Sequence, residues 1–256
     1  MSRSKSRSEM ELWESSLVRP GDERLIAEEI ALQIQELIIA DDLPEGLRLP
    51  SERDLAEMMF TSRPTVSQAI RILVVKGLVE SRRGSGAYVM RRPEASLAAS
   101  VDLMLDLNHE SVWHLSELRL WLETAGVNEA MNRITAAEVS AGEQALERLR
   151  VSSATTAGWM SADTQFHATL VRSSHNPYLS SIFESVHTTL INYEYREWVS
   201  VGKLPKWLGP HQASTLISLH EPILNAVKDR DEEAGRRAVL EHHLAMVQHL
   251  RASEDE

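Results

Sequence analysis

The sequence has no cysteine among its 256 residues, which excludes disulfides and thiol catalysis and agrees with folding in a reducing compartment. It has no apolar run near 18 residues, so we expect no helix that spans a membrane. The basic, serine-rich residues 1–9 are not followed by an apolar segment and therefore do not predict a signal peptide. HExxH, GxSxG and phosphate-loop strings are absent as well. We therefore expect a cytoplasmic protein that is not an enzyme.

Charge is distributed unevenly along this acidic chain, whose formal net charge is −11. Residues 48–92 contain nine Lys/Arg and four Asp/Glu, a net charge of +5. Residues 93–256 contain 13 and 23 respectively, a net charge of −10. Basic residues are thus concentrated in one segment, as binding to DNA phosphates requires. The acidic remainder must have another role.

The length is typical of two domains. Composition and charge predict their limits: a disordered N-terminal arm over residues 1–21, a DNA-binding domain over 22–92, a helical domain over 93–251 and a tail over 252–256.

The basic segment has the pattern of a helix-turn-helix. Apolar residues recur at helical spacing over residues 22–40, which predicts a supporting helix. A short helix follows Ser51, whose hydroxyl we expect to cap it. Pro64 suits the first turn of the next helix, and Gly77 suits its C-terminal cap.

Two short β-prone runs, residues 78–80 and 87–90, follow these helices and predict a hairpin whose tip contains Arg82 and Arg83. A helix pair followed by a basic hairpin is a winged helix-turn-helix, a geometry that reads DNA. A protein-binding module of the same shape is the alternative interpretation.

The acidic half shows helical patches separated by helix breakers and no long strand-like alternation. It predicts an all-α bundle of six or seven helices. The predicted helices cover about residues 95–107, 111–132, 135–150, 158–174, 178–199, 212–229 and 231–251.

Four residues of this bundle suggest a metal site. Asp163 and His167 are four positions apart and share one helical face, and His220 and His242 follow on the two final helices. One carboxylate and three imidazoles that face a core suit Zn, Ni, Mn or Fe. A solvated Asp–His pair is the alternative. His243 is the fallback for His242, whose apolar neighbours favour an inward orientation.

Two further features leave alternatives open. Pro222 predicts that a helix either begins near His220 or bends there, because proline lacks the backbone N–H. Arg119 and Glu123 are spaced as i and i+4, which fits a surface ion pair.

The strings LPSERDLAEMM and SRPTVSQAIRILVVKGLVESRRGSGAYV resemble the N-terminal domain of the GntR family of bacterial transcription regulators. The resemblance implies that Arg53, Ser62, Arg63 and Thr65 contact operator bases or phosphates, and that Gly84 lies on the wing that enters the minor groove. We add two residues to this predicted DNA-binding set, Ser67 on the recognition helix and Arg82 at the wing tip. The family commonly has an arginine at the position of Ser67, so this chain should read a different operator.

The strings DTQFHATLVRSSHNPYL and HEPILNAVKDRDEEAGRRAVLEHHL resemble the FadR-type C-terminal ligand-binding domain, the FCD domain, of one GntR subfamily. In that domain one Asp and three His bind a metal. The resemblance therefore implies that Asp163, His167, His220 and His242 bind a divalent metal, zinc first. It also implies that Arg119 faces an effector cavity and pairs with an anionic ligand.

Together these patterns predict a homodimeric DNA-binding transcription regulator, a repressor on a double-stranded, pseudo-palindromic operator. A small organic acid, either a sugar acid or a hydroxy acid, would release it. The alternatives are a metal-independent regulator of another ligand, a metalloenzyme, or an architectural protein whose helical half only dimerises.

Overall fold

The computed structural model describes Trp13 and residues 26–91, 94–108, 111–151, 155–208 and 213–254. The chain forms two compact units, and the boundary between them lies between Ser96 and Leu97. The rest of the predicted arm, the linker at Arg92-Pro93 and the last two residues of the predicted tail lie outside the described residues.

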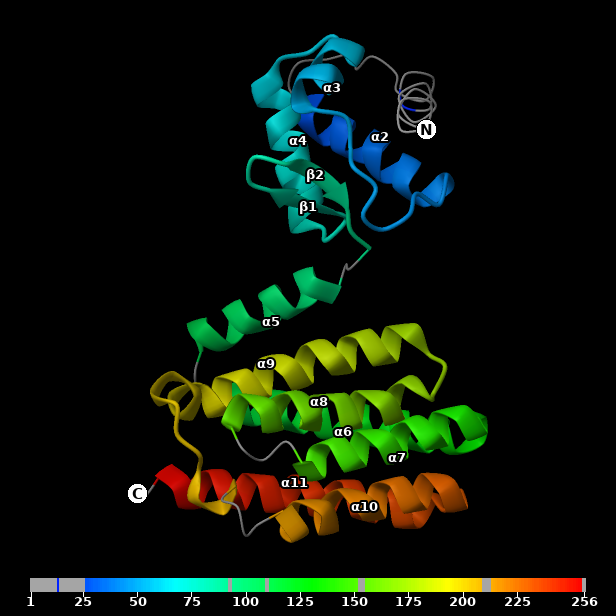
Figure 1. Ribbon diagram of the computed structural model, residues 1–256, viewed down its shortest axis with the longest axis vertical. Coiled ribbons are helices and arrows are strands. Elements are labelled where there is room, and N and C mark those ends of the chain that lie inside the picture. The colour runs from blue at the N-terminus through cyan, green and yellow to red at the C-terminus, as the bar shows by residue number, and fades with distance from the viewer. Residues whose placement is uncertain are drawn as a thin grey trace. The chain divides into compact units, whose positions relative to one another are not determined.

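The first unit is a winged helix-turn-helix, as the sequence predicts (Figure 1). Its elements are α2 (Ile26–Ala40), α3 (Glu52–Met58), α4 (Arg63–Val75), β1 (Val79–Arg82) and β2 (Gly86–Val89). The strands pair antiparallel, with Val79 opposite Val89. Local caps explain where the two central helices begin, because Ser51 Oγ accepts from the Asp54 N–H and Ser62 Oγ accepts from the Thr65 N–H.

An apolar core holds this unit together. Ile30 and Ile34 of α2, Leu55 of α3 and Leu73 of α4 are all fully buried in it. Trp13, which the sequence assigns to the N-terminal arm, is only 1% exposed and belongs to the same core. Burial of such side chains supplies the main stabilisation of a small domain.

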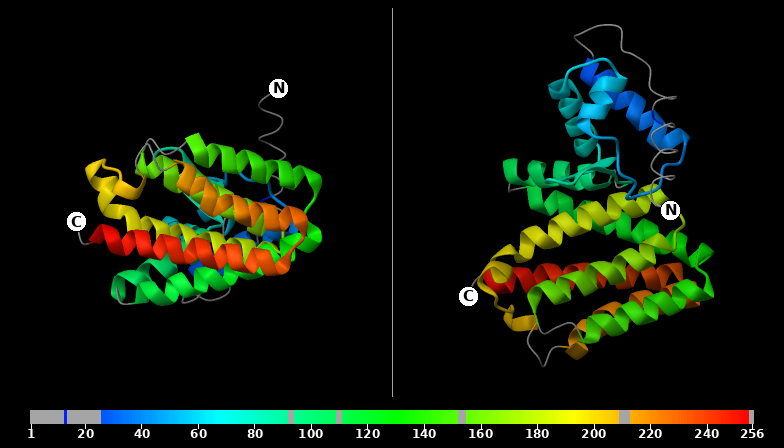
Figure 2. Two further views of the ribbon diagram at one scale, coloured as in Figure 1. Left: turned by 90° about the horizontal axis from the view of Figure 1, so that it is seen from below. Right: turned by 45° about the horizontal axis from the view of Figure 1, so that its top comes forward.

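The second unit is an all-α bundle, again as predicted (Figure 2). Helix α5 (Glu94–Leu107) crosses the boundary between the units. The remaining elements are α6 (Val112–Arg133), α7 (Ala136–Val151), α8 (Thr156–Arg172), α9 (Pro177–Val201), the short 3-10 helix η2 (Lys206–Leu208), α10 (Ala213–Asp229) and α11 (Glu232–Glu254). Helices α10 and α11 lie side by side in both figures, and α8 packs on α7 and α9.

Close helix packing positions the polar centre of this bundle. Gly126 lets α6 approach α8, since a Cβ at this position would lie 2.7 Å from Val171 Cγ1. Glu123 of α6, one turn before Gly126, therefore lies close enough to contact His167 of α8. Among the described residues, no helix combines the length and apolar composition that a membrane span needs.

Candidate functional site

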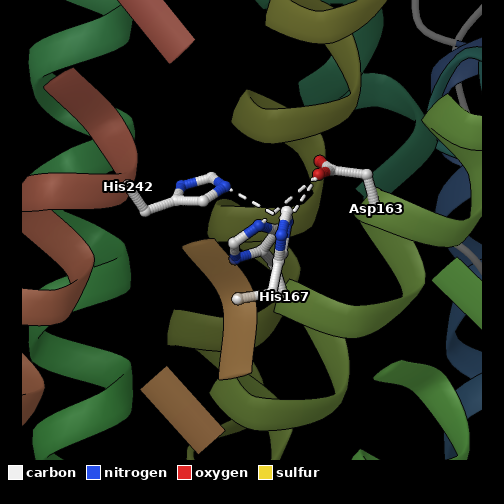
Figure 3. Close-up of side chains that lie close together, drawn as sticks. Asp163, His167 and His242 are labelled. Atoms are coloured by element: carbon white, nitrogen blue, oxygen red, sulfur yellow. Dashed lines mark hydrogen bonds and ion pairs between the residues drawn. The ribbon is translucent and has the colours of Figure 1, made fainter. Parts of the chain in front are cut away.

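Three helices bring the four predicted metal ligands together. Asp163 and His167 lie one turn apart on α8, His220 comes from α10, and His242 comes from α11 (Figure 3). Asp163 is 2% exposed and the three histidines are fully buried. One ligand atom from each residue lies within 4.8 Å of the ligand atoms of the other three.

The donor atoms of this group fit a divalent cation. His220 Nε2 lies 3.0 Å from Asp163 Oδ1 and 3.1 Å from His242 Nε2. Two imidazole nitrogens at that distance can share only one proton, and a cation between them would satisfy both lone pairs. His167 Nε2 and His242 Nδ1 have no hydrogen-bond partner in the described part of the chain. Three nitrogens and one carboxylate oxygen are a common donor set for zinc and similar metals.

A fifth side chain, His187 of α9, is also fully buried beside this group, although the sequence did not single it out. Its Nε2 lies 3.4 Å from Asp163 Oδ2. Burial lowers the pKa of His187, which favours the neutral ring. In the sequence, the apolar residues Phe183 and Leu190, four positions before and three after His187, share its helical face and were the available signal of its inward orientation.

Glu123 of α6 fixes the orientation of one predicted ligand. Its Oε1 accepts a hydrogen bond from His167 Nδ1 at 2.5 Å, which directs Nε2 of the same ring toward Asp163 at 3.7 Å. A carboxylate behind a histidine in this way selects the tautomer that binds metal.

Electrostatics of this pair favour a bound cation. Burial alone would raise the pKa of Glu123, but the charge and hydrogen bond of His167, together with Arg119, lower it to about 2. Burial alone would lower the pKa of His167, but Glu123 and Asp163 raise it to about 9. A positive charge at this position, from a proton or a metal, therefore stabilises the two buried carboxylates.

Arg119 lies one turn before Glu123 on α6, and its side chain is only 7% exposed. Its Nη2 is 3.6 Å from Glu123 Oε2, so the pair is buried and the surface ion pair expected as one alternative is wrong. Nε and Nη2 of Arg119 have no hydrogen-bond partner among the described residues. A buried guanidinium with unused N–H groups is a suitable partner for an additional anion.

The neighbouring His243 is separate from the four-residue group. It is 9% exposed and lines a cavity of about 490 Å³ together with Trp113 and Glu117. Burial lowers its pKa. The structure therefore orients His242, and not the fallback His243, toward Asp163 and His220.

Pro222 lies inside α10, which extends from Ala213 to Asp229. Of the two alternatives that the sequence left open, a helix that begins near His220 is wrong, because more than one turn of helix precedes that residue.

In the first unit, four of the seven predicted DNA-binding residues line one basic hollow of about 620 Å³ between α3, α4 and the hairpin. Its lining includes a set of arginines and the wing-tip glycine: Arg48, Arg53, Arg63, Arg82, Arg83 and Gly84. Gly84 has a φ of +75°, which suits the tight turn at the hairpin tip.

The start of α4 places further predicted residues beside this hollow. Ser62 and Thr65 share a hydrogen bond of 2.7 Å between their hydroxyl groups. Ser67 is half-buried on the same helix and does not line the hollow. Arg53 and Arg82 both pair with nearby acids, since Arg53 Nε lies 3.6 Å from Glu57 and Arg82 Nη2 lies 3.0 Å from Glu80.

Comparison with known families assigns both units. Residues 26–89 match the model of the bacterial regulatory proteins of the gntR family, and residues 114–246 match that of the FCD domain.

Two relatives cover most of the chain. The Uxu operon transcriptional regulator of Escherichia coli K12 is 29% identical over 84% of this chain and 82% of its own length. The HTH-type transcriptional repressor NanR of Klebsiella aerogenes is 31% identical over 90% of this chain and 86% of its own. Among solved structures, Streptococcus agalactiae GntR has the same fold, with a TM-score of 0.63, 24% identity, and coverage of 86% of this chain and 98% of that one.

Proposed function

Because this chain belongs to the gntR family of bacterial regulatory proteins and has an FCD domain, it is a transcription regulator and not an enzyme, and we propose that it is a repressor. A small organic acid, either a sugar acid or a hydroxy acid, binds its helical unit and releases it from its operator. The name of the Klebsiella relative, a transcriptional repressor, supports repression. Because its partner is chromosomal DNA, we expect it to work in the cytoplasm.

The buried group of Asp163, His167, His220 and His242 carries this proposal. Such a polar cluster is costly to bury unless a cation satisfies it. We propose that these four residues hold one divalent ion, with zinc as the first choice. When bound, the ion supplies positive charge and a coordination position for an oxygen ligand.

Arg119 is the proposed reader of the effector carboxylate. The helical half has a net charge of −10 and therefore repels acids at long range, so local cations are needed to hold one. Arg119 offers unused N–H groups, and its planar fork matches a carboxylate with two parallel hydrogen bonds. It also pairs with Glu123, which orients His167.

The proposed DNA contacts come from Arg53, Ser62, Arg63, Thr65, Ser67, Arg82 and Gly84. The basic hollow that most of them line supports this assignment. Sequence readout is expected mainly from Arg63, which begins the recognition helix α4.

We propose that two chains pair through the helical unit and bind a pseudo-palindromic operator. Large apolar side chains that remain exposed on α6 and α11 support pairing: Leu118, Trp121, Leu240 and Leu244. The acid would change the relative placement of the two DNA-binding units. A coupling of about 1–3 kcal/mol changes operator affinity by roughly 5–150-fold.

The test is an anisotropy titration. A duplex selected from a random library by the zinc-loaded full-length protein is labelled, and carboxylic acids are added to the complex. We expect at least one acid to release the DNA, and chelation of the metal to abolish that response. Release by the acid from metal-free protein would favour the alternative, a metal-independent regulator. A complex that no acid affects would overturn the proposed effector class.

A further inference from the structure

The helical unit contains a cavity of about 480 Å³ that none of the four proposed metal ligands lines. Three helices form its walls. Ser116 and Trp113 come from α6, Glu194 and Trp198 come from α9, and Val247 comes from α11. Tyr193, Arg196 and Glu197 of α9 line it as well, so the walls combine aromatic rings with two hydroxyl groups, two carboxyl groups and one guanidinium.

This cavity adjoins the proposed carboxylate site. Ser116 is buried and lies one turn before Arg119 on the same face of α6. On α9, Glu194 lies seven positions after His187, which is two helical turns or about 10 Å along the axis. Burial raises the pKa of Glu194 to about 7. The charge of Arg119 opposes this rise and the charge of Asp163 adds to it, so Glu194 lies within electrostatic range of both residues.

The chemistry of the cavity suits hydroxyl groups. Glu194 is half-buried and forms no hydrogen bond or ion pair within the part of the chain that the structure describes. A carboxylate accepts hydrogen bonds from adjacent hydroxyls of a sugar, and these charge-assisted bonds are strong. The flat rings of Trp113 and Trp198 can pack against the C–H groups of the same molecule.

A short hydroxy acid fits this arrangement poorly. With its carboxylate at Arg119, such an acid would leave most of the cavity of about 480 Å³ unfilled, and Glu194 would gain no hydrogen-bond donor. An acid of six carbons would fill more of this volume and would offer Glu194 further hydroxyl groups as hydrogen-bond donors.

We infer that this cavity binds the hydroxylated chain of a sugar acid of six or more carbons, with Glu194 as the residue that distinguishes such acids from short hydroxy acids. The inference rests on the proposed function, because it requires that the carboxylate bind beside Arg119.

Isothermal titration calorimetry of the zinc-loaded full-length protein tests it. The probes are D-gluconate, D-galacturonate and D-glucuronate, compared with L-lactate and glycolate. We expect at least one six-carbon acid to bind at least about tenfold more tightly than lactate, as expected from one added charge-assisted hydrogen bond. Glu194→Gln should remove most of that difference and leave the Kd of lactate and the zinc content unchanged.

Trp198→Leu should act in the same selective way, because it removes an aromatic wall. Glu129→Gln is the matched control, since Glu129 is half-exposed on α6 and pairs only with Arg133 among the described contacts. This control should change neither affinity.

The outcomes separate this inference from the proposed function. If lactate binds as tightly as every six-carbon acid, or if Glu194→Gln weakens both classes equally, Glu194 has no role in specificity and the inference is overturned. If the parent protein binds none of the acids and its operator complex responds to none, the proposed effector class itself fails.

Discussion

The two units differ in what they bury. In the winged helix-turn-helix unit, the described core contains only apolar side chains. Among the described residues, every buried polar or charged side chain lies in the helical unit. Six of them are Asp163 and the acid and histidines around it: Glu123, Asp163, His167, His187, His220 and His242. The interior of the first unit is therefore stabilised by burial of apolar area. Under the proposed function, the stability of the helical unit also depends on the cation at its centre, whereas that of the DNA-binding unit does not.

Metal removal should give the largest difference between the units. A ligand at a thousand times its Kd stabilises a fold by about 4 kcal/mol. Chelation should therefore increase hydrogen exchange in α8, α10 and α11 and leave α2–α4 unchanged, with recovery when zinc is restored. His220→Ala, which removes a ligand, should lose the metal by elemental analysis and then show no response to chelator. If hydrogen exchange in α8, α10 and α11 were the same with and without chelator, the helical unit would not depend on a bound metal.

The pH dependence of the metal-free protein should show the same contrast. The pKa of His167 is raised from 6.5 to about 9. Its contribution to the free energy of unfolding is therefore complete below pH 6.5 and disappears as the pH rises through 9. The shift corresponds to about 3 kcal/mol. The pKa of Glu123 is lowered from 4.5 to about 2, so its contribution is present above pH 4.5 and disappears as the pH falls through 2.

Denaturant unfolding between pH 6 and 9.5 measures this dependence. Without metal, the helical unit should lose stability across that range, whereas the winged unit should not. With zinc the trend should reverse, because protons compete with the metal for His167. A flat profile for the metal-free helical unit would mean that Glu123 and His167 are not coupled.

In the DNA-binding unit, Arg63→Ala should weaken operator binding by about 2 kcal/mol, the typical value of a good base contact, and should not affect metal content. Anisotropy with the selected duplex measures the loss. Arg71→Ala is the matched control, because Arg71 lies on the same helix, has the same charge and does not line the basic hollow. Similar losses in both variants would show that charge alone matters and that α4 is misassigned as the recognition helix.

In the helical unit, Arg119→Lys should raise the acid concentration needed to release the protein from its operator by about tenfold, because lysine keeps the charge but lacks the planar fork. Operator affinity without acid should be unchanged. Arg133→Lys provides the control, since Arg133 pairs with Glu129 on the outside of the same helix. A variant at Arg119 that responds like the parent would limit Arg119 to its ion pair with Glu123.

The smallest effect is expected from Ile34→Val in the core of the winged unit. Removal of one buried methylene should lower the free energy of unfolding by about 1 kcal/mol. The loss should be the same with and without zinc. A loss that depends on zinc would show that the two units do not unfold independently.

The sequence predicted the elements well because their ends depend on local chemistry. Ser51 caps the helix that it was expected to begin, Pro64 lies in the first turn of α4 as expected, and Gly77 follows α4 with a φ of +69°. Helix α8 begins at Thr156, slightly earlier than predicted, because Thr155 Oγ1 accepts from the Gly158 N–H. The limits of the domains remain predictions.

The candidate site was predictable only in part. The spacing of Asp163 and His167 places both on one face of α8, and His220 and His242 were selected by their positions on the two final helices, which the family resemblance supported. His187 and the inward position of Glu123 depend on how α6 and α9 are rotated against α8, and that rotation follows from distant contacts such as Gly126 against Val171. Spacing along α6 could not distinguish a surface pair at Arg119 and Glu123 from the buried one.

Charges alternate along a row of contacts that leads from the proposed metal ligands to the residue proposed to bind the carboxylate: Asp163, His167, Glu123 and Arg119. Under the proposed function, the two sites at its ends are linked, and the acid tightens zinc binding by the same factor as zinc tightens acid binding. Such a repressor works as a coincidence detector. A cell starved of zinc would then keep the regulated genes silent even when their inducer is abundant.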